Sequence, residues 1–236
     1  MVLVLFDIDG TLLRSRGVGL RAMEEALTEL HGIPVDGNSI KSGGRLDPHI
    51  FIEMSEMHDL PVHDEALLAF RDTYVARMAH AFDMDSWSTA LPGAREMVKA
   101  VHDHPDMTCA MMTGNIEPTS WMKLQDAGFE REWFEFGVYG DEGEIRRDLT
   151  TVALERHRDR TGEPFAPAQA VVIGDTEHDI DCAHHSGCQA IAVTTGMTSR
   201  ETLAAHEPEL LLDTLEDTNM VMKWLESRQL RAAATD

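Results

Sequence analysis

Lysine is scarce in this chain of 236 residues, which has four lysines against sixteen arginines. Basic residues number 20 and acidic residues 42, so the formal net charge is −22 at pH 7. Nucleic acids and anionic membrane surfaces are bound through basic patches. The charge balance therefore argues against both as partners, and any anionic substrate must be held by a few local cations.

Cysteine and long apolar runs are scarce as well. The three cysteines (Cys109, Cys182 and Cys188) are odd in number and form no CxxC pair, which favours free thiols and a cytoplasmic protein. No apolar stretch approaches the roughly 18 residues of a membrane-spanning helix. The apolar N-terminus lacks the basic lead-in of a signal peptide, so we expect it to be a strand.

The first segment is the most informative part of the sequence. Residues 2–6 are wholly apolar and lead directly into Asp7 and Asp9, which Gly10 and Thr11 follow. Such runs are typical of strands buried on both faces of a parallel sheet, and ligands bind beyond the carboxyl ends of these strands. Two neighbouring buried carboxylates need a cation or a shared proton. We therefore expect a site at the end of this strand.

Two later predicted strands also end in polar residues. Residues 107–112 lead into Thr113-Gly114-Asn115, and residues 170–173 lead into Gly174 and Asp175, with Asp179 four residues further on. Further strands are predicted over 190–193 and 210–212, with helical patterns between them. This alternation predicts an α/β fold with a parallel sheet, whose carboxyl ends would bring the polar residues together.

Residues 15–88 carry helical patterns only. Apolar residues recur at helical spacing over 20–30, 50–57 and 67–78, and Asp47 before Pro48 is predicted to cap the second helix. We expect a helical insertion over 15–88, a core formed by 1–14 and 89–230, and a disordered tail over 231–236.

The three strand ends together resemble the signatures of the haloacid dehalogenase superfamily. The matching segments are Asp7-Ile8-Asp9-Gly10-Thr11-Leu12 for the first signature, Met112-Thr113-Gly114-Asn115 for the second and Gly174-Asp175 through Asp179 for the fourth. The helical insertion resembles the α-helical cap of that superfamily. The chain is most similar to its phosphoglycolate-phosphatase-like members, which implies a Rossmann-like parallel core with an inserted cap.

The resemblance implies a Mg²⁺-dependent phosphatase that hydrolyses a small phosphorylated metabolite, a phosphate monoester, through an aspartyl-phosphate on Asp7. Asp9 would be the general acid and then the general base. Asp7, the backbone carbonyl of Asp9 and Asp175 would bind Mg²⁺. Thr113-Gly114-Asn115 would bind the phosphoryl group. Asp179 would orient the water shell of the metal or the cationic residue of the site.

The third signature of the superfamily is usually a lysine between the second and the fourth, and here the sequence departs from the pattern. No lysine lies between Lys123 and Gly174. Arg146 is the favoured substitute and Arg147 the alternative, since a guanidinium keeps its charge and can bind both phosphate oxygens and Asp7.

Ser42-Gly43-Gly44-Arg45 resembles the substrate-specificity loop of the superfamily, in which Arg45 would bind an acidic head group. A plain interhelical loop with an exposed arginine is the alternative. Other functions stay open: a phosphosugar mutase, a metal-independent haloacid dehalogenase (against which Asp9 speaks), a phosphonate-cleaving enzyme that uses Lys41, and a catalytically inactive binding module. We expect a monomer or a homodimer.

Overall fold

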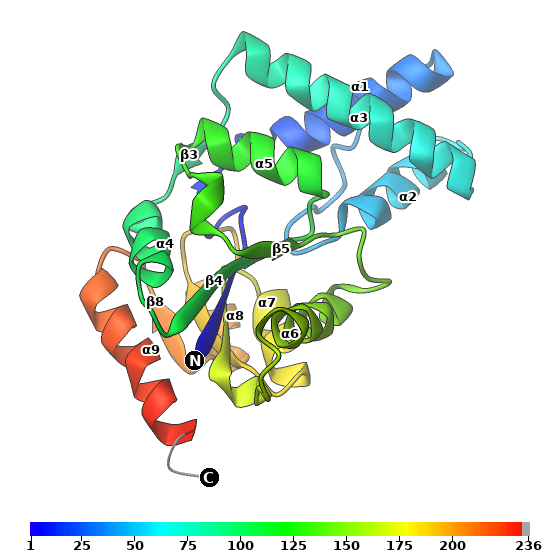
Figure 1. Ribbon diagram of the computed structural model, residues 1–236. Helices are drawn as coiled ribbons and strands as arrows, with labels where there is room; N and C mark the ends of the chain where they lie inside the picture. The colour runs from blue at the N-terminus through cyan, green and yellow to red at the C-terminus, as the bar shows by residue number, and fades with distance from the viewer. Residues whose placement is uncertain (233–236) are drawn as a thin grey trace.

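A parallel β-sheet forms the centre of the protein in the computed structural model, which describes residues 1–232 (Figure 1). Within those residues the sheet has six strands in the spatial order β5-β4-β1-β6-β7-β8, and all neighbouring strands are parallel. The strands are β1 (Val2–Phe6), β4 (Met107–Met112), β5 (Phe136–Val138), β6 (Ala170–Gly174), β7 (Gln189–Val193) and β8 (Leu210–Leu212). The predicted Rossmann-like α/β core is confirmed.

Both faces of the sheet are covered by helices, which explains why β1 is apolar throughout. Val2, Val4 and Phe6 pack into an apolar cluster on one face, and Leu3 and Leu5 pack into a second cluster on the other. The first face is covered by α4 (Ala94–His102), α5 (Glu117–Asp126) and α9 (Thr218–Ala232), and the second by α6 (Arg146–Thr161), α7 (Glu177–His185) and α8 (Arg200–Ala205). β1 therefore lies at the centre of the core, and its carboxyl end is flanked by those of β4 and β6.

Three further helices form a separate group at the top of Figure 1. They are α1 (Val18–His31), α2 (Asp47–Met57) and α3 (Asp64–Met84), and they share an apolar cluster of their own. The chain leaves the core through β2 (Leu13–Arg14) and returns through β3 (Thr89–Ala90), which pair antiparallel. Figure 1 shows α5 between the sheet and this helical group, and α3 packs directly on it. The carboxyl edge of the sheet is therefore covered by helices.

One local expectation, the capping role of Asp47, needs correction. Helix α2 begins at Asp47, with Leu46 as its N-cap, so Asp47 is not the capping residue. Instead, the Asp47 carboxylate accepts a hydrogen bond from the backbone N–H of Ile116, 3.1 Å away. Helix α9 extends to Ala232, and the rest of the predicted tail over 231–236 lies outside the described residues.

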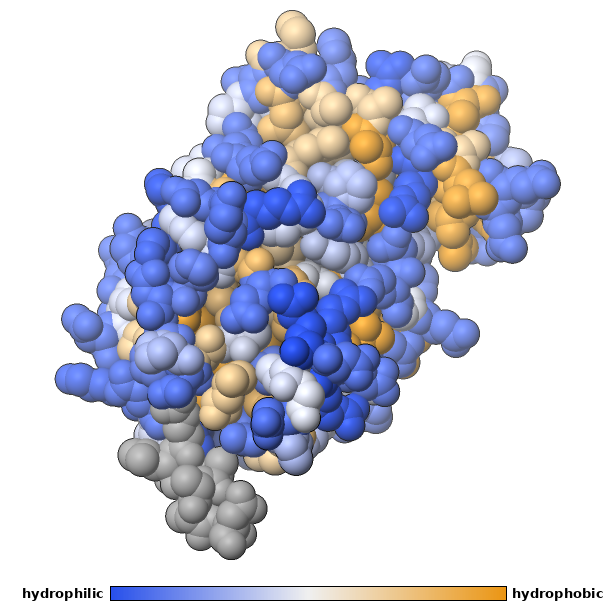
Figure 2. Space-filling view, viewed as in Figure 1, coloured by the Kyte–Doolittle hydropathy of each residue, from blue (hydrophilic) through white to orange (hydrophobic). Residues whose placement is uncertain are grey.

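The surface of the molecule differs between the core and the helical group. Figure 2 shows hydrophilic side chains over most of the core, whereas apolar side chains gather on the upper part, over the helical group. Leu68 and Met84, both on α3, are 61% and 73% exposed. Among the described residues, no helix is both long and apolar enough to cross a membrane.

The junction between the returning chain and the core depends on Gly93, which has a φ of +76° and precedes α4. A Cβ at this position would lie only 2.2–2.4 Å from backbone atoms of Leu215 and Glu216. Gly32 has a similar φ of +68°, but a Cβ there would meet nothing within 4 Å.

We predict that Gly93→Ala lowers the free energy of unfolding by roughly 3–5 kcal/mol. The alanine must adopt the left-handed conformation of Gly93, and the backbone at Leu215 and Glu216 must also move to make room for its Cβ. The matched Gly32→Ala variant should lose only about 1–2 kcal/mol, the conformational cost alone. Urea denaturation of both variants measures the difference. Equal losses would show that the approach to Leu215 imposes no constraint.

Candidate active site

Three strand ends meet in a cavity of about 400 Å³ at the carboxyl edge of the sheet. Asp7 follows β1, Thr113 follows β4 and Asp175 follows β6, and all three line the cavity together with Asp9. The sequence places these residues far apart, and the parallel sheet brings them together because β1 pairs with both β4 and β6. Residues 42–45 of the helical group and residues 195–198 after β7 complete the wall.

Three carboxylates are gathered around one guanidinium. Asp7, Asp175 and Asp179 are buried, and each offers an oxygen within 4.8 Å of the other two. The Nη2 atom of Arg146 donates to Asp7 Oδ1 at 3.0 Å and also to Asp179. The second oxygen of Asp179 accepts from the backbone N–H and hydroxyl of Thr176, at 3.1 and 2.7 Å. Asp179 therefore holds Arg146 against Asp7.

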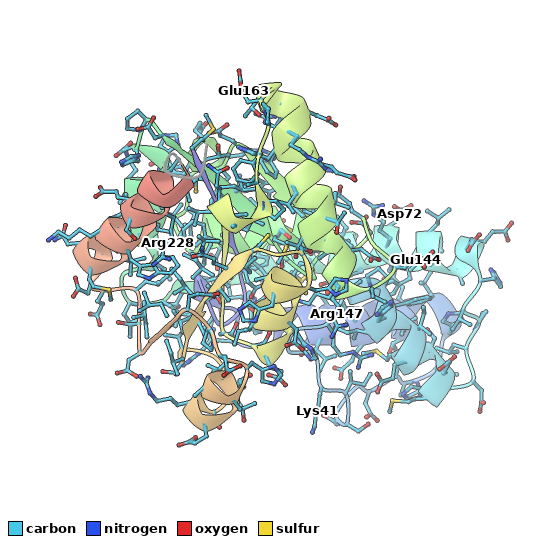
Figure 3. All side chains as sticks on the ribbon, turned by 90° about the horizontal axis from the view of Figure 1, so that it is seen from below. Lys41, Asp72, Glu144, Arg147, Glu163 and Arg228 are labelled. Carbon is cyan, nitrogen blue, oxygen red and sulfur yellow. The ribbon has the colours of Figure 1, made fainter. Side chains whose placement is uncertain are left out.

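The two arginines weighed from the sequence lie in different surroundings. The side chain of Arg146 is 10% exposed and that of Arg147 is 51% exposed. Arg147, in the first turn of α6, approaches Asp181 at 3.9 Å and lies at the surface (Figure 3). Arg146 therefore contacts the carboxylate cluster, and Arg147 does not.

Burial is the main influence on the pKa values of Asp7 and Asp175. It raises the pKa of Asp7 well above its ordinary value; the charges of Asp179 and Asp175 add to this rise, and Arg146 opposes it. Burial likewise raises the pKa of Asp175 to about 7, with a further contribution from Asp179. When all three carboxylates are ionised, the single guanidinium of Arg146 balances one of their charges, and no described residue balances the other two.

The donor set of this cluster fits a divalent cation. Carboxylate oxygens are the ligands that Mg²⁺ prefers, and opposite ligands of an octahedral Mg²⁺ ion lie about 4.2 Å apart. Two glycines leave room for the Asp175 carboxylate: a Cβ on Gly10 would fall 2.4 Å and one on Gly196 1.6 Å from its Oδ2, while Thr11 donates to its Oδ1 at 3.1 Å. Asp7 and Asp175 both line the cavity. The residues present therefore offer both the charge and the space that such an ion needs.

Asp9 lies in a different electrostatic environment from Asp7. Its Oδ1 accepts from the Ser15 hydroxyl at 2.7 Å, and its Oδ2 accepts from Asn115 Nδ2 at 2.8 Å and from Lys123 Nζ at 2.7 Å. Burial alone would raise the pKa of Asp9, but the charge of Lys123 and these hydrogen bonds together lower it below its ordinary value. The two aspartates of the first signature therefore differ sharply in proton affinity.

Lys123 is the site residue that the sequence analysis missed. It lies on α5 with its side chain 5% exposed, and it was considered only as the last lysine before a gap. The position of Lys123 is the signal that predicts its burial near the site. It stands between Trp121 and Leu124, which pack into the core, on a helix that begins two residues after Asn115.

Thr113 is oriented by the residue two positions later. The N–H and the side-chain amide of Asn115 both donate to Thr113 Oγ1, at 3.2 and 2.8 Å. No described residue accepts the hydrogen of the Thr113 hydroxyl. That hydrogen is therefore available to a ligand in the cavity.

The helical group contacts the second signature through the start of α2. Asp47 N–H donates to the Gly114 carbonyl at 2.8 Å, and its carboxylate accepts from Ile116 N–H. Burial raises the pKa of Asp47 to about 6, which the charge of Lys123 partly offsets. The hydroxyl of Tyr74, from α3, lies 3.5 Å from Asp47 Oδ2. These contacts tie α2 and α3 to the loop that carries Thr113.

Arg45 and Lys41 lie on the loop before α2. Arg45 lines the cavity, and its guanidinium pairs with Glu53 of α2. Lys41 is exposed, and Figure 3 shows it at the outer end of the loop, pointing away from the sheet. The structure therefore does not bring Lys41 to the carboxylate cluster, which removes the basis for a phosphonate-cleaving enzyme.

Comparison with known proteins supports a single superfamily. The HAD-hydrolase-like family model matches residues 145–218, which include Arg146, Asp175 and Asp179. A phosphoglycolate phosphatase of Vibrio vulnificus (strain YJ016) is 25% identical over 231 residues, covering 90% of this chain and 92% of the relative.

Solved structures share the fold. A predicted phosphoglycolate phosphatase from Haemophilus somnus 129PT superposes with a TM-score of 0.70 at 18% identity, covering 94% of this chain and 98% of the other. A putative β-phosphoglucomutase from Bacteroides vulgatus gives 0.68 at 19% identity, covering 97% and 90%. With the signatures assembled at one sheet edge, the chain is similar to the haloacid dehalogenase-like hydrolases, and among them to the phosphoglycolate-phosphatase-like members.

Proposed function

We propose that this hydrolase is a Mg²⁺-dependent phosphatase that cleaves a small phosphate monoester through an aspartyl-phosphate on Asp7. The supporting observation is the pairing of Asp7 with Arg146 inside a cluster that lacks two positive charges. The relative named phosphoglycolate phosphatase, which matches nearly the whole chain, supports the same reaction class. A cavity of about 400 Å³ suits a small metabolite.

Asp7, Asp175 and the backbone carbonyl of Asp9 would hold the Mg²⁺ ion, and Asp179 would orient its surroundings. The bound ion would supply positive charge that offsets repulsion between the carboxylate and the phosphate. Arg146 would hold Asp7 in line with the phosphorus atom and bind a phosphoryl oxygen. The Thr113 hydroxyl, with Gly114 and Asn115, would donate hydrogen bonds to the phosphoryl group.

Proton transfer falls to Asp9. An Asp7 oxygen forms a bond to phosphorus while the ester P–O bond breaks, and the leaving oxygen keeps the electron pair of that bond and takes a proton from Asp9. The substrate phosphate, by its negative charge and by excluding water, favours the protonated form of this carboxyl group. Asp9 then accepts a proton from the water that hydrolyses the aspartyl-phosphate, which returns both side chains to their starting state.

The cellular setting belongs to the same proposal. The three cysteines, Cys109, Cys182 and Cys188, are free and buried, which suits a reducing compartment such as the cytoplasm. We take the enzyme to act there as a monomer or homodimer on a small phosphorylated metabolite, with Arg45 near the substrate end of the cavity.

We predict that Asp7→Asn abolishes phosphate release, with kcat/KM for p-nitrophenyl phosphate lower by at least about 10³-fold, because an amide is not a nucleophile. Melting temperature should be unchanged or higher, because the buried charge is removed. The exposed Asp83→Asn variant is the matched control.

Equal, metal-independent turnover by wild type and Asp7→Asn would contradict the proposal and favour the inactive binding module. Turnover of haloacetate with chelator present would favour a dehalogenase, and sugar-phosphate isomerisation without phosphate release would favour a mutase.

The raised pKa of Asp175 predicts a pH dependence. In the metal-free protein this carboxyl group keeps its proton up to about pH 7, whereas the unfolded chain releases it near pH 4. Its stabilising contribution is therefore full below about pH 4 and is lost as pH rises through 7. The melting temperature of metal-free wild type should fall between pH 5 and 8 relative to Asp175→Asn.

Mg²⁺ must displace that proton, so its affinity should weaken by about tenfold per pH unit below about pH 7. Isothermal titration calorimetry at pH 6 and 8, in buffers of differing ionisation enthalpy, measures both the affinity and the proton release. Identical affinities at the two pH values, without proton release, would contradict the assignment of Asp175 as a ligand.

The two adjacent arginines provide a matched pair. We predict that Arg146→Ala lowers kcat/KM by about 10²–10³-fold, because the phosphoryl group and Asp7 lose their shared cation. Arg146→Lys should recover part of this loss, whereas Arg147→Ala should stay within about twofold of wild type, as expected for an exposed charge. Similar losses for the two alanine variants would show that the contact between Arg146 and Asp7 has no catalytic role.

A further inference from the structure

The buried side chain of Lys123 is hydrogen-bonded to Asp9, the proposed acid–base group. Lys123 Nζ lies 2.7 Å from Asp9 Oδ2 and 2.7 Å from Asn115 Oδ1. The other three lysines of the chain (Lys41, Lys99 and Lys223) are exposed. Since a charged ammonium group is costly to bury, the position of Lys123 calls for an explanation beyond ordinary helix packing.

The contacts of Lys123 fix two site residues at once. By accepting from Lys123, the carbonyl oxygen of Asn115 turns the amide nitrogen toward Asp9, to which it donates at 2.8 Å. The same ammonium group donates directly to Asp9 Oδ2, while Ser15 donates to the other oxygen. Three donors from separate segments of the chain therefore define the plane of the Asp9 carboxylate.

The position of α5 connects this arrangement to the helical group. Figure 1 shows α5 between the sheet and the helices above it. Lys123 lines the active-site cavity together with Asp47 of α2 and Tyr74 of α3. The lysine therefore lies where the helical group, the second signature and Asp9 meet.

We propose that Lys123 is a positioning residue for proton transfer, which holds the Asp9 carboxyl group and the Asn115 amide at the leaving oxygen of the substrate. The inference rests on the proposed phosphatase function. Without Lys123, the Asp9 side chain loses its ammonium donor and retains its bonds to Ser15 and Asn115. The Asn115 carbonyl oxygen loses its donor, and only the contacts of the amide nitrogen with Asp9 and Thr113 then orient that amide. Formation of the bond between Asp7 and phosphorus is unaffected, and delivery of the proton from Asp9 to the departing oxygen becomes inefficient.

The dependence on the leaving group tests this role. p-Nitrophenolate leaves as a stable anion and needs little proton donation, whereas an alkoxide leaves only with a proton. Lys123→Met should lower kcat/KM by about 10²-fold or more for an alkyl phosphate such as 2-phosphoglycolate or glycerol 2-phosphate, and by less than about threefold for p-nitrophenyl phosphate. Because kcat/KM reports steps up to the first irreversible one, hydrolysis of the aspartyl-phosphate does not obscure the comparison.

Slow hydrolysis of that intermediate should appear separately. With p-nitrophenyl phosphate, Lys123→Met should release a rapid burst of about one nitrophenolate per enzyme and then turn over slowly, because Asp9 is also misplaced as a base. Lys99→Met, on the exposed face of α4, is the control and should behave as wild type. Lys123→Gln, which retains hydrogen-bond donors, should recover part of the alkyl-phosphate activity and replaces Lys123→Met if that variant does not fold.

A double-mutant cycle with Asp9→Asn separates positioning from other roles. If Lys123 acts through Asp9, Lys123→Met should cost less than about twofold in kcat/KM when Asp9 is already Asn. Equal losses for aryl and alkyl substrates, or losses that add in the double mutant, would overturn the inference. An effect on KM alone, specific to substrates with an acidic head group, would show instead that Lys123 binds the substrate. If wild type released no phosphate from any ester, the proposed function itself would fail.

Discussion

The site depends on the placement of three buried carboxylates around one guanidinium. Asp7, Asp175 and Asp179 reach the same point because the carboxyl ends of β1 and β6 lie side by side and because α7 begins immediately after β6. Arg146 bridges Asp7 and Asp179, but one positive charge balances only part of the cluster. Burial raises the proton affinity of Asp7 and Asp175. Under the proposed function, a bound divalent cation would relieve this unfavourable charge.

The ammonium group of Lys123 gives Asp9 an environment that differs from that of Asp7. Asp7 is paired with Arg146, whereas Asp9 is paired with Lys123. Two carboxylates two residues apart thus acquire opposite pKa shifts: the pKa of Asp7 is raised, chiefly by burial, and the pKa of Asp9 is lowered by Lys123 and its hydrogen bonds despite burial. Pairs of acids whose environments separate their proton affinities are typical of enzymes that need a nucleophile and an acid–base group together.

The sequence predicted the fold well because the relevant signals are local. The apolar strands β1, β4 and β6 each lead into polar signature residues, and β1 could be recognised from residues 2–6 alone. Edge strand β5 was not predicted, because its three residues include a glycine and form too short a run to show a period. Asp47 was predicted as a helix cap, but a long-range contact decides its role: Ile116 lies 69 residues away.

The distinction between local sequence signals and long-range contacts applies to the site as well. The preference for Arg146 over Arg147 followed from the need for a cation, and the structure places it against Asp7. Lys123 was missed because nothing in the spacing of the signatures predicts that α5 turns this side chain back toward Asp9. That contact depends on how the helix packs between the sheet and the helical group, which no local pattern encodes.

A crystal structure of the protein with Mg²⁺ tests the central claim most directly. The account predicts one ion with carboxylate oxygens of both Asp7 and Asp175 about 2.1 Å away, and with Arg146 still paired to Asp7. An ion bound elsewhere, or Asp7 and Asp175 too far apart to share one, would contradict it.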